Sequence, residues 1–224
     1  VVAILDELNL HAPCPIYLVL GNHDYYGSSV AKVREVMKGW SESQTASKWM
    51  PEAGVISLTD MTALIGHGGW GDGRVGDFMA SGIMLNDYVQ IEDLAGHTKA
   101  GLLKQLNALG TEAAEFLTTQ LETAIQTHEE IILLTHVPPF FEATWHEGEV
   151  VLSEWTPHFA CGAVGECLVE IMNEHPTKSL KVLCGHTHGA GRAEILPNLE
   201  VLTGGAEYGN PKLQPPVEVN YPLG

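Results

Sequence analysis

Three short apolar runs constrain the fold of this chain most. Each run is followed directly by side chains that bind metals well. The runs and the residues after them are 16–20 with Gly21-Asn22-His23-Asp24, 131–134 with Thr135-His136, and 180–184 with Gly185-His186-Thr187-His188. Apolar runs of this length, bounded by turn residues, predict buried strands. Ligand sites in α/β sheets form outside the carboxyl ends of strands. We call the point where each run passes into its polar residues a joint, and we expect the three joints to meet in one crevice.

The segments around these runs alternate between helix and strand patterns. We expect helices over residues 1–8, 94–109, 112–127 and 164–175, and one that Ser28 or Ser29 caps and that buries Trp40. We expect further strands at 55–58 and 62–65, paired as a hairpin, and at 193–196 and 199–203. This order predicts an α/β layered fold with a mixed sheet. The chain shows no repeat or linker, so residues 1–224 are expected to form a single domain.

The charge balance limits the partners of the chain. Its 11 Lys and Arg residues face 28 Asp and Glu residues, a formal net charge of −17. Such a charge repels polyanions and argues against a nucleic-acid surface or a membrane surface, and an anionic substrate would need local cations. The four cysteines include no Cys-x-x-Cys pair, so we expect reduced thiols and a cytoplasmic location. The oligomeric state is left open.

The residue types at the three joints restrict the metal. Imidazoles and an Asn carbonyl oxygen, without thiolates, suit zinc, manganese or iron better than calcium or magnesium. A single histidine beside a strand end is more often a packed or surface residue. Three such joints favour a metal site, because burying several imidazoles without partners is costly. Gly21 and Gly185 are expected to allow tight turns and close backbone approach there.

The motifs resemble those of a known family. Gly21-Asn22-His23-Asp24, His136 within Leu134-Thr135-His136-Val137-Pro138-Pro139, and Gly185-His186-Thr187-His188 are similar to the last three of five motifs of calcineurin-like metallophosphoesterases. The resemblance spans about residues 1–205. It implies a four-layer α-β-β-α sandwich with mixed sheets and a centre of two divalent or trivalent metal ions. It also implies hydrolysis of a small phosphomonoester or phosphodiester by a metal-activated hydroxide.

The same resemblance assigns roles to individual residues. It implies that Asn22, His136 and His186 hold one metal, while His188 belongs to the other. His23 would be the acid that stabilises the transition state or protonates the leaving oxygen, and Asp24 would orient and charge it. These roles make physical sense, because bound metals polarise phosphoryl oxygens and a histidine beside a carboxylate can stay protonated for the leaving group.

The first two motifs of the family are absent from these 224 residues. No Asp-x-His occurs, and Gly71-Asp72 and Gly76-Asp77 follow no buried strand, so they are rejected as substitutes for the Gly-Asp motif. We therefore expect the N-terminal strands to be missing here, with at least about 30 further residues before Val1 in the gene product. Without the carboxylates of those motifs, we expect this chain alone to hold one metal at most and to lack full phosphatase activity.

Two long irregular segments are expected to decide the substrate. Residues 66–87 carry seven glycines, and residues 140–161 carry Trp145 and Trp155. Segments of this length are usually functional lids or disordered, and their glycines and tryptophans favour lids. Arg74 is a candidate for binding the substrate phosphate, although a lone arginine is more often a solvated charge.

Two classes of function follow. The first is a metal-dependent phosphoesterase. The alternative is a non-catalytic scaffold of the same fold that binds a protein partner. The absent motifs favour the scaffold, whereas retention of His23, Asp24, His136, His186 and His188 favours the enzyme, because a scaffold has no need for that set.

Overall fold

A six-stranded mixed sheet organises most of the chain in the computed structural model, which describes residues 1–150 and 154–219. The strand order is β3-β4-β5-β8-β10-β9. The bounds are β3 Ile56–Ser57, β4 Thr62–Gly66, β5 Glu130–Leu134, β8 Ser179–Cys184, β9 Gly191–Leu196 and β10 Leu199–Thr203. The four central strands run parallel, and β3 and β9 are antiparallel edges. The predicted α/β fold with a mixed sheet is confirmed.

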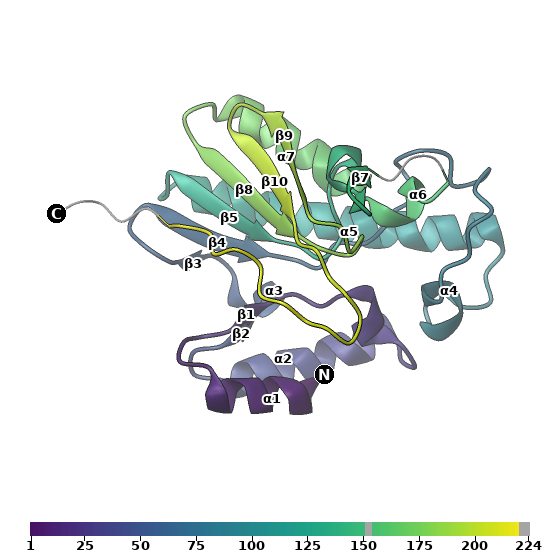
Figure 1. The fold of residues 1–224 in the computed structure, drawn as a ribbon, viewed down its shortest axis with the longest axis horizontal. Coiled ribbons are helices and arrows are strands. Elements are labelled where there is room, and N and C mark those ends of the chain that lie inside the picture. Colours follow the sequence, from purple (N-terminus) through teal and green to yellow (C-terminus); the bar gives the residue numbers. More distant parts are fainter. Residues whose placement is uncertain (151–153, 220–224) are drawn as a thin grey trace.

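Two small sheets accompany the large one. They are the parallel pair β1 (Tyr17–Leu18) with β2 (Lys48–Trp49) and the antiparallel pair β6 (Trp145–His146) with β7 (Glu149–Val150). The pair β1–β2 corresponds to the second sheet of the expected sandwich. Among the described residues this sheet has two short strands. Helices α1 (Val2–His11) and α2 (Val30–Ser43) pack beside it (Figure 1), where the Trp40 indole donates to Asp6. Ser29 caps α2 by accepting from Lys32 N–H, as predicted.

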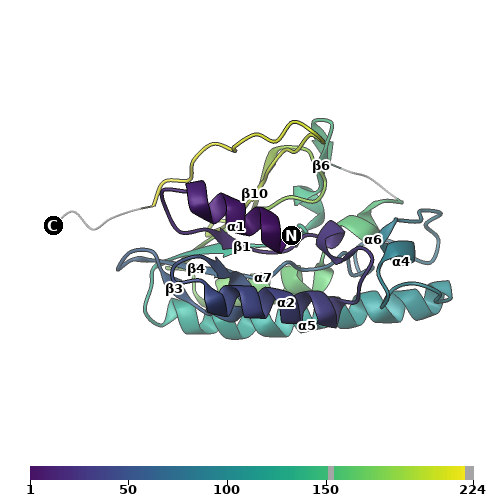
Figure 2. The same ribbon diagram turned by 90° about the horizontal axis from the view of Figure 1, so that it is seen from below.

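The remaining helices differ in size. They are α3 (Met50–Ala53), α4 (Asp87–Gln90), α5 (Lys99–Ile125), α6 (Thr156–Phe159) and α7 (Gly162–Glu174), with 3-10 turns η1 (Asn22–Tyr25) and η2 (Phe141–Ala143). Helices α5 and α7 lie side by side on one face of the large sheet (Figures 1 and 2). Leu117 and Leu121 of α5 pack there with Leu133 and Leu168, all fully buried. None of the helices within residues 1–150 and 154–219 is long and apolar enough to cross a lipid bilayer.

The expectation of two helices over 94–109 and 112–127 is wrong, because α5 runs without interruption from Lys99 to Ile125. Gly110, at the expected break, is buried inside the helix. A Cβ atom at Gly110 would lie 2.4 Å from the Cβ of Asp72. The glycine is therefore needed for close packing against the segment that follows β4, and it does not end the helix.

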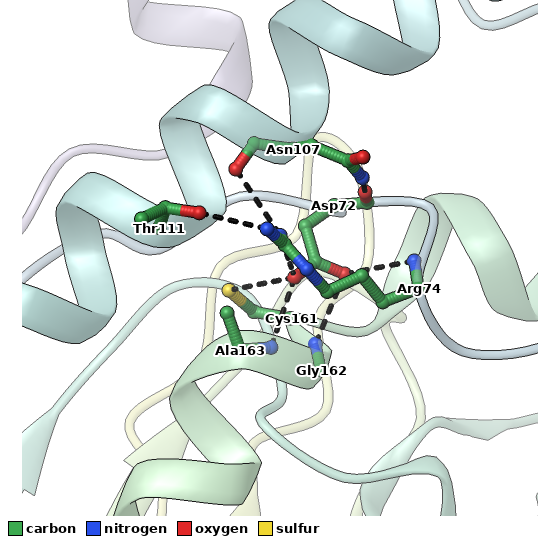
Figure 3. A network of polar contacts seen from close by, with 7 residues as sticks. All are labelled: Asp72, Arg74, Asn107, Thr111, Cys161, Gly162 and Ala163. Carbon is green, nitrogen blue, oxygen red and sulfur yellow. Dashed lines mark hydrogen bonds and ion pairs between the residues drawn. The ribbon is translucent and has the colours of Figure 1, made fainter.

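Asp72, in that segment, is completely buried and joins three parts of the chain. Its carboxylate accepts from the backbone N–H groups of Gly162 (3.0 Å) and Ala163 (2.9 Å) at the start of α7. It also forms an ion pair of 2.8 Å with Arg74, whose other nitrogen donates to Thr111 of α5. Figure 3 shows this network. Acidic groups at a helix N-terminus satisfy free N–H donors and stabilise the helix dipole.

This network bears on residues 66–87, which were expected to form a lid. Trp70 and Phe78 of this segment are buried, and the backbone N–H groups of Asp72 and Gly73 donate to the carbonyl oxygens of Ala160 and Pro157. The segment is anchored to α5, α6 and α7 along much of its length, and it differs in this from a free lid. The other expected lid, 140–161, carries η2, β6, β7 and α6; its residues 151–153 lie outside the described part.

Replacing Asp72 with asparagine should lower the free energy of unfolding by about 3 kcal/mol, because it removes one partner of a buried ion pair. Asp77→Asn is the matched control. Asp77 is exposed in the same segment and caps Ala80 N–H at 2.9 Å, and asparagine caps about as well as aspartate, so stability should change by less than about 0.5 kcal/mol. Urea unfolding followed by circular dichroism measures both. Equal midpoints for the two variants would contradict the anchoring role.

Candidate metal centre

The three joints predicted to converge do meet in one pocket. A cavity of about 600 Å³ is lined by residues that follow β1, β5 and β8, among them Asn22, His23, Asp24, His136, His186 and His188. Strands β5 and β8 are parallel neighbours, so their carboxyl ends bring His136 and His186 to the same edge. The turn after β1 supplies Asn22 from the other sheet.

Three donor atoms lie at the centre of this pocket. The His136 Nε2 atom is 3.0 Å from the Asn22 Oδ1 atom and 3.1 Å from the His186 Nδ1 atom. Gly21 makes the approach possible, because a Cβ atom there would lie 2.8 Å from the Cε1 atom of His136. The predicted close approach at Gly21 is therefore confirmed.

Gly185 was expected to allow a tight turn and close backbone approach, but the unusual backbone conformations of this turn occur at His186 and His188. Nothing lies within 4 Å of a Cβ atom built on Gly185, so close approach does not require glycine there. Instead His186 and His188 adopt left-handed backbone conformations, with φ of 69° and 65°. Such values are uncommon outside glycine and store strain at functional sites. The turn after β8 thus places both imidazoles at the pocket at an energetic cost.

Burial favours the neutral form of His136, His186 and His188 by lowering the pKa of each. It lowers the pKa of His186 to about 4, although the Asp87 charge and the His158 carbonyl oppose the shift. Burial, followed by the nearby histidines His186, His23 and His188, lowers the pKa of His136 well below its usual value. Burial also lowers the pKa of His188, and His23 and His146 add to the shift. Neutral imidazoles are the form that binds a metal.

Asp87 orients the Asn22 amide, a contact that no sequence motif indicates. The Asn22 Nδ2 atom donates to both carboxylate oxygens of Asp87, at 2.9 and 3.0 Å, and the Tyr26 hydroxyl donates to the same carboxylate at 2.6 Å. Asp87 is 3% exposed. Because the nitrogen of the amide is engaged, its oxygen faces His136. Asp87 lies 65 residues from Asn22, so only the folded chain reveals the contact.

Asp24 does not play the part expected of it. Its Oδ2 atom accepts from Gly21 N–H at 2.9 Å, because an acidic side chain at the third position of η1 reaches back to cap the turn. The exposed His23 ring lies instead between two tyrosines, with centroid distances of 4.7 Å to Tyr26 and 6.2 Å to Tyr208. Among the described residues, no bond between Asp24 and His23 supports the expected pair.

Arg74, expected at the substrate phosphate, lies elsewhere. Its guanidinium pairs with Asp72 and donates to the Asn107 carbonyl oxygen and to Thr111, so its donors serve the loop anchor (Figure 3). The neighbouring carboxylate explains the difference, since Asp72 is buried and needs a cation.

The donor set fits a single ion. Adjacent ligands that each lie about 2.1 Å from one metal are about 3.0 to 3.4 Å apart, which matches the separations at His136. Within residues 1–150 and 154–219, no three His, Cys, Asp or Glu side chains are grouped to hold a metal, and the third donor here is an amide oxygen. Asp24 and Asp87 are the carboxylates that line the described pocket. Asp24 accepts from Gly21 N–H through one oxygen, and both oxygens of Asp87 accept from Asn22.

Comparison with known proteins adds two findings. A sequence model of the calcineurin-like phosphoesterase family matches residues 2–190. Among solved structures, the chain is similar to a dimetal phosphatase from Danio rerio, with 13% sequence identity and a TM-score of 0.49, over 91% of this chain. The chain spans 63% of the length of that structure. No curated protein matches the chain.

Proposed function

The chain belongs to the calcineurin-like phosphoesterase family, and from this premise we propose that it is a metal-dependent hydrolase of a small phosphomonoester or phosphodiester. The family consists of metal-dependent phosphoester hydrolases. One observation carries the proposal for this chain. At the strand ends, the His136 Nε2 atom lies 3.0 Å from Asn22 Oδ1 and 3.1 Å from His186 Nδ1.

The pocket residues that the sequence motifs contribute each have a role in this proposal. Asn22, His136 and His186 would hold one ion, for which manganese, iron or zinc suits the donors, and His188 would belong to a second. A bound divalent ion polarises the phosphoryl oxygen and lowers the pKa of water, which supplies a nucleophile near neutral pH. His23 donates a proton to the leaving oxygen, and the rings of Tyr26 and Tyr208 hold its imidazole in place. Asp24 acts indirectly, by fixing the turn that carries Asn22 and His23.

A non-catalytic scaffold that binds a protein partner is the second candidate. One observation favours it: both carboxylates that line the described pocket already accept hydrogen bonds from neighbouring residues. The strained backbone of the histidines at 186 and 188 favours the enzyme, because binding a partner elsewhere does not require that strain.

Metal analysis combined with hydrolysis distinguishes the two candidates. We expect the purified chain to bind manganese or zinc and to hydrolyse an aryl phosphate when the ion is added. A panel of phosphomonoesters, cyclic nucleotides and phosphoproteins then defines the substrate class. A chain that binds no metal and hydrolyses none of them would refute the enzyme and leave the scaffold.

Replacing Asp87 with asparagine should weaken metal binding by about 10- to 100-fold, the usual loss when the partner that orients a ligand is removed. The new amide accepts fewer hydrogen bonds, so the Asn22 oxygen is no longer held toward His136. Isothermal titration calorimetry with manganese measures the affinity. Asp77→Asn, in the same segment but away from the pocket, should leave it unchanged, and equal affinity of both variants would show that Asp87 does not position Asn22.

A further inference from the structure

A row of aromatic rings extends from the three metal-donor residues toward solvent. The His186 ring lies 4.9 Å from the His136 ring and 5.1 Å from the Phe159 ring, which meets it edge-on at 90°. The Phe159 ring in turn stacks on Trp155 at 5.3 Å and 24°. Trp155, at the outer end of this row of rings, is 42% exposed and therefore open to solvent. Trp155 and Phe159 both line the same pocket as the donors.

A further aromatic side chain lines the pocket beside His188 and His23. Tyr208 is 73% exposed and meets the His188 ring at 4.8 Å and the His23 ring at 6.2 Å. A ligand whose phosphate sits at the histidines would therefore have aromatic rings beside its organic part. Exposed rings cost little to desolvate and stack favourably on flat groups.

The charges of the pocket restrict that organic part further. Among the described residues that line it, the side chains with a full charge are Asp24 and Asp87, and neither lysine nor arginine occurs. Recognition of additional phosphates or carboxylates normally uses arginine or lysine. The pocket therefore disfavours substrates that carry anionic groups beyond the reacting phosphate, such as nucleoside triphosphates or acidic phosphopeptides.

Resting on the function proposed above, we infer that Trp155 and Phe159 form a stacking platform for a planar, uncharged aromatic group esterified to the reacting phosphate. The substrate class is an aromatic phosphoester with one phosphate. Trp155 provides the face of the platform, and Phe159 supports it from the side of His186.

Two matched ligands test this inference. Benzyl phosphate and cyclohexylmethyl phosphate have the same charge and similar size, but only the first is flat and aromatic. Calorimetry with the manganese-loaded chain should show that benzyl phosphate binds about fivefold to tenfold more tightly. Trp155→Leu should remove this preference, whereas Trp155→Phe, which keeps a ring, should retain most of it.

The outcomes separate the platform from the proposed function. Equal affinity for the two ligands, or a preference that survives Trp155→Leu, would overturn the platform. Hydrolysis of benzyl phosphate is measured in parallel. If the preference depends on residue 155 but neither ligand is hydrolysed, the platform stands as a binding site and the hydrolase proposal fails.

Discussion

Alanine at position 136 should remove stoichiometric metal from the chain and lower phosphoester hydrolysis by at least about a hundredfold. Loss of a partner that only orients a ligand costs about 10- to 100-fold, and loss of a ligand itself should cost more. His136 is the central donor, because its Nε2 atom contacts both Asn22 and His186. Metal content by mass spectrometry and hydrolysis of an aryl phosphate are measured on the same preparation.

The control for His136→Ala is His97→Ala. His97 is an exposed histidine that precedes α5, away from the pocket, and its loss should change neither metal content nor activity. Thermal unfolding shows whether His136→Ala still folds, since the ring of His136 fills space against Gly21. A folded variant that keeps its metal would remove His136 from the donor set.

Alanine at position 23 should act differently, lowering turnover by about a hundredfold while metal content stays unchanged. The exposed His23 ring lies between Tyr26 and Tyr208, outside the contacts that join the three donors. A proton donor matters most when the leaving group is a poor one. The loss should therefore be large with benzyl phosphate and small with 4-nitrophenyl phosphate, whose leaving group needs no proton.

Metal content decides how a defect in His23→Ala is interpreted. If the variant loses metal to the same degree as His136→Ala, then His23 is a ligand and the assigned roles are wrong. If both phosphates lose activity equally with metal retained, His23 binds the phosphate and does not act as the acid.

The convergence of the three joints was predictable because local patterns determine it. An apolar run that ends in polar residues marks the carboxyl end of a strand, and parallel strands align those ends. Local patterns also predicted a cap for α2 at Ser28 or Ser29, of which Ser29 forms it, and the hairpin β3–β4. Each of these signals lies in a few neighbouring residues, although the three strand ends that meet come from distant parts of the sequence.

The features that sequence reasoning missed depend on contacts between distant segments. Two helices were expected over 94–109 and 112–127, but Gly110 between them is a point where the single helix α5 packs against Asp72. Arg74 was considered a phosphate ligand, but a buried carboxylate engages it. Asp87 went unassigned because its contact with Asn22 crosses 65 residues. Periodicity and motif spacing carry no information about such pairings.

The left-handed backbone of His186 and His188 has a consequence for how this turn tolerates change. A non-glycine residue in that conformation costs about 1 kcal/mol or more, so glycine at either position would relieve strain while deleting an imidazole. Thermostability and ligand capture are therefore in direct conflict at these two positions. A library selected only for heat resistance would drift toward glycine or asparagine there, whereas one selected for turnover would keep both histidines.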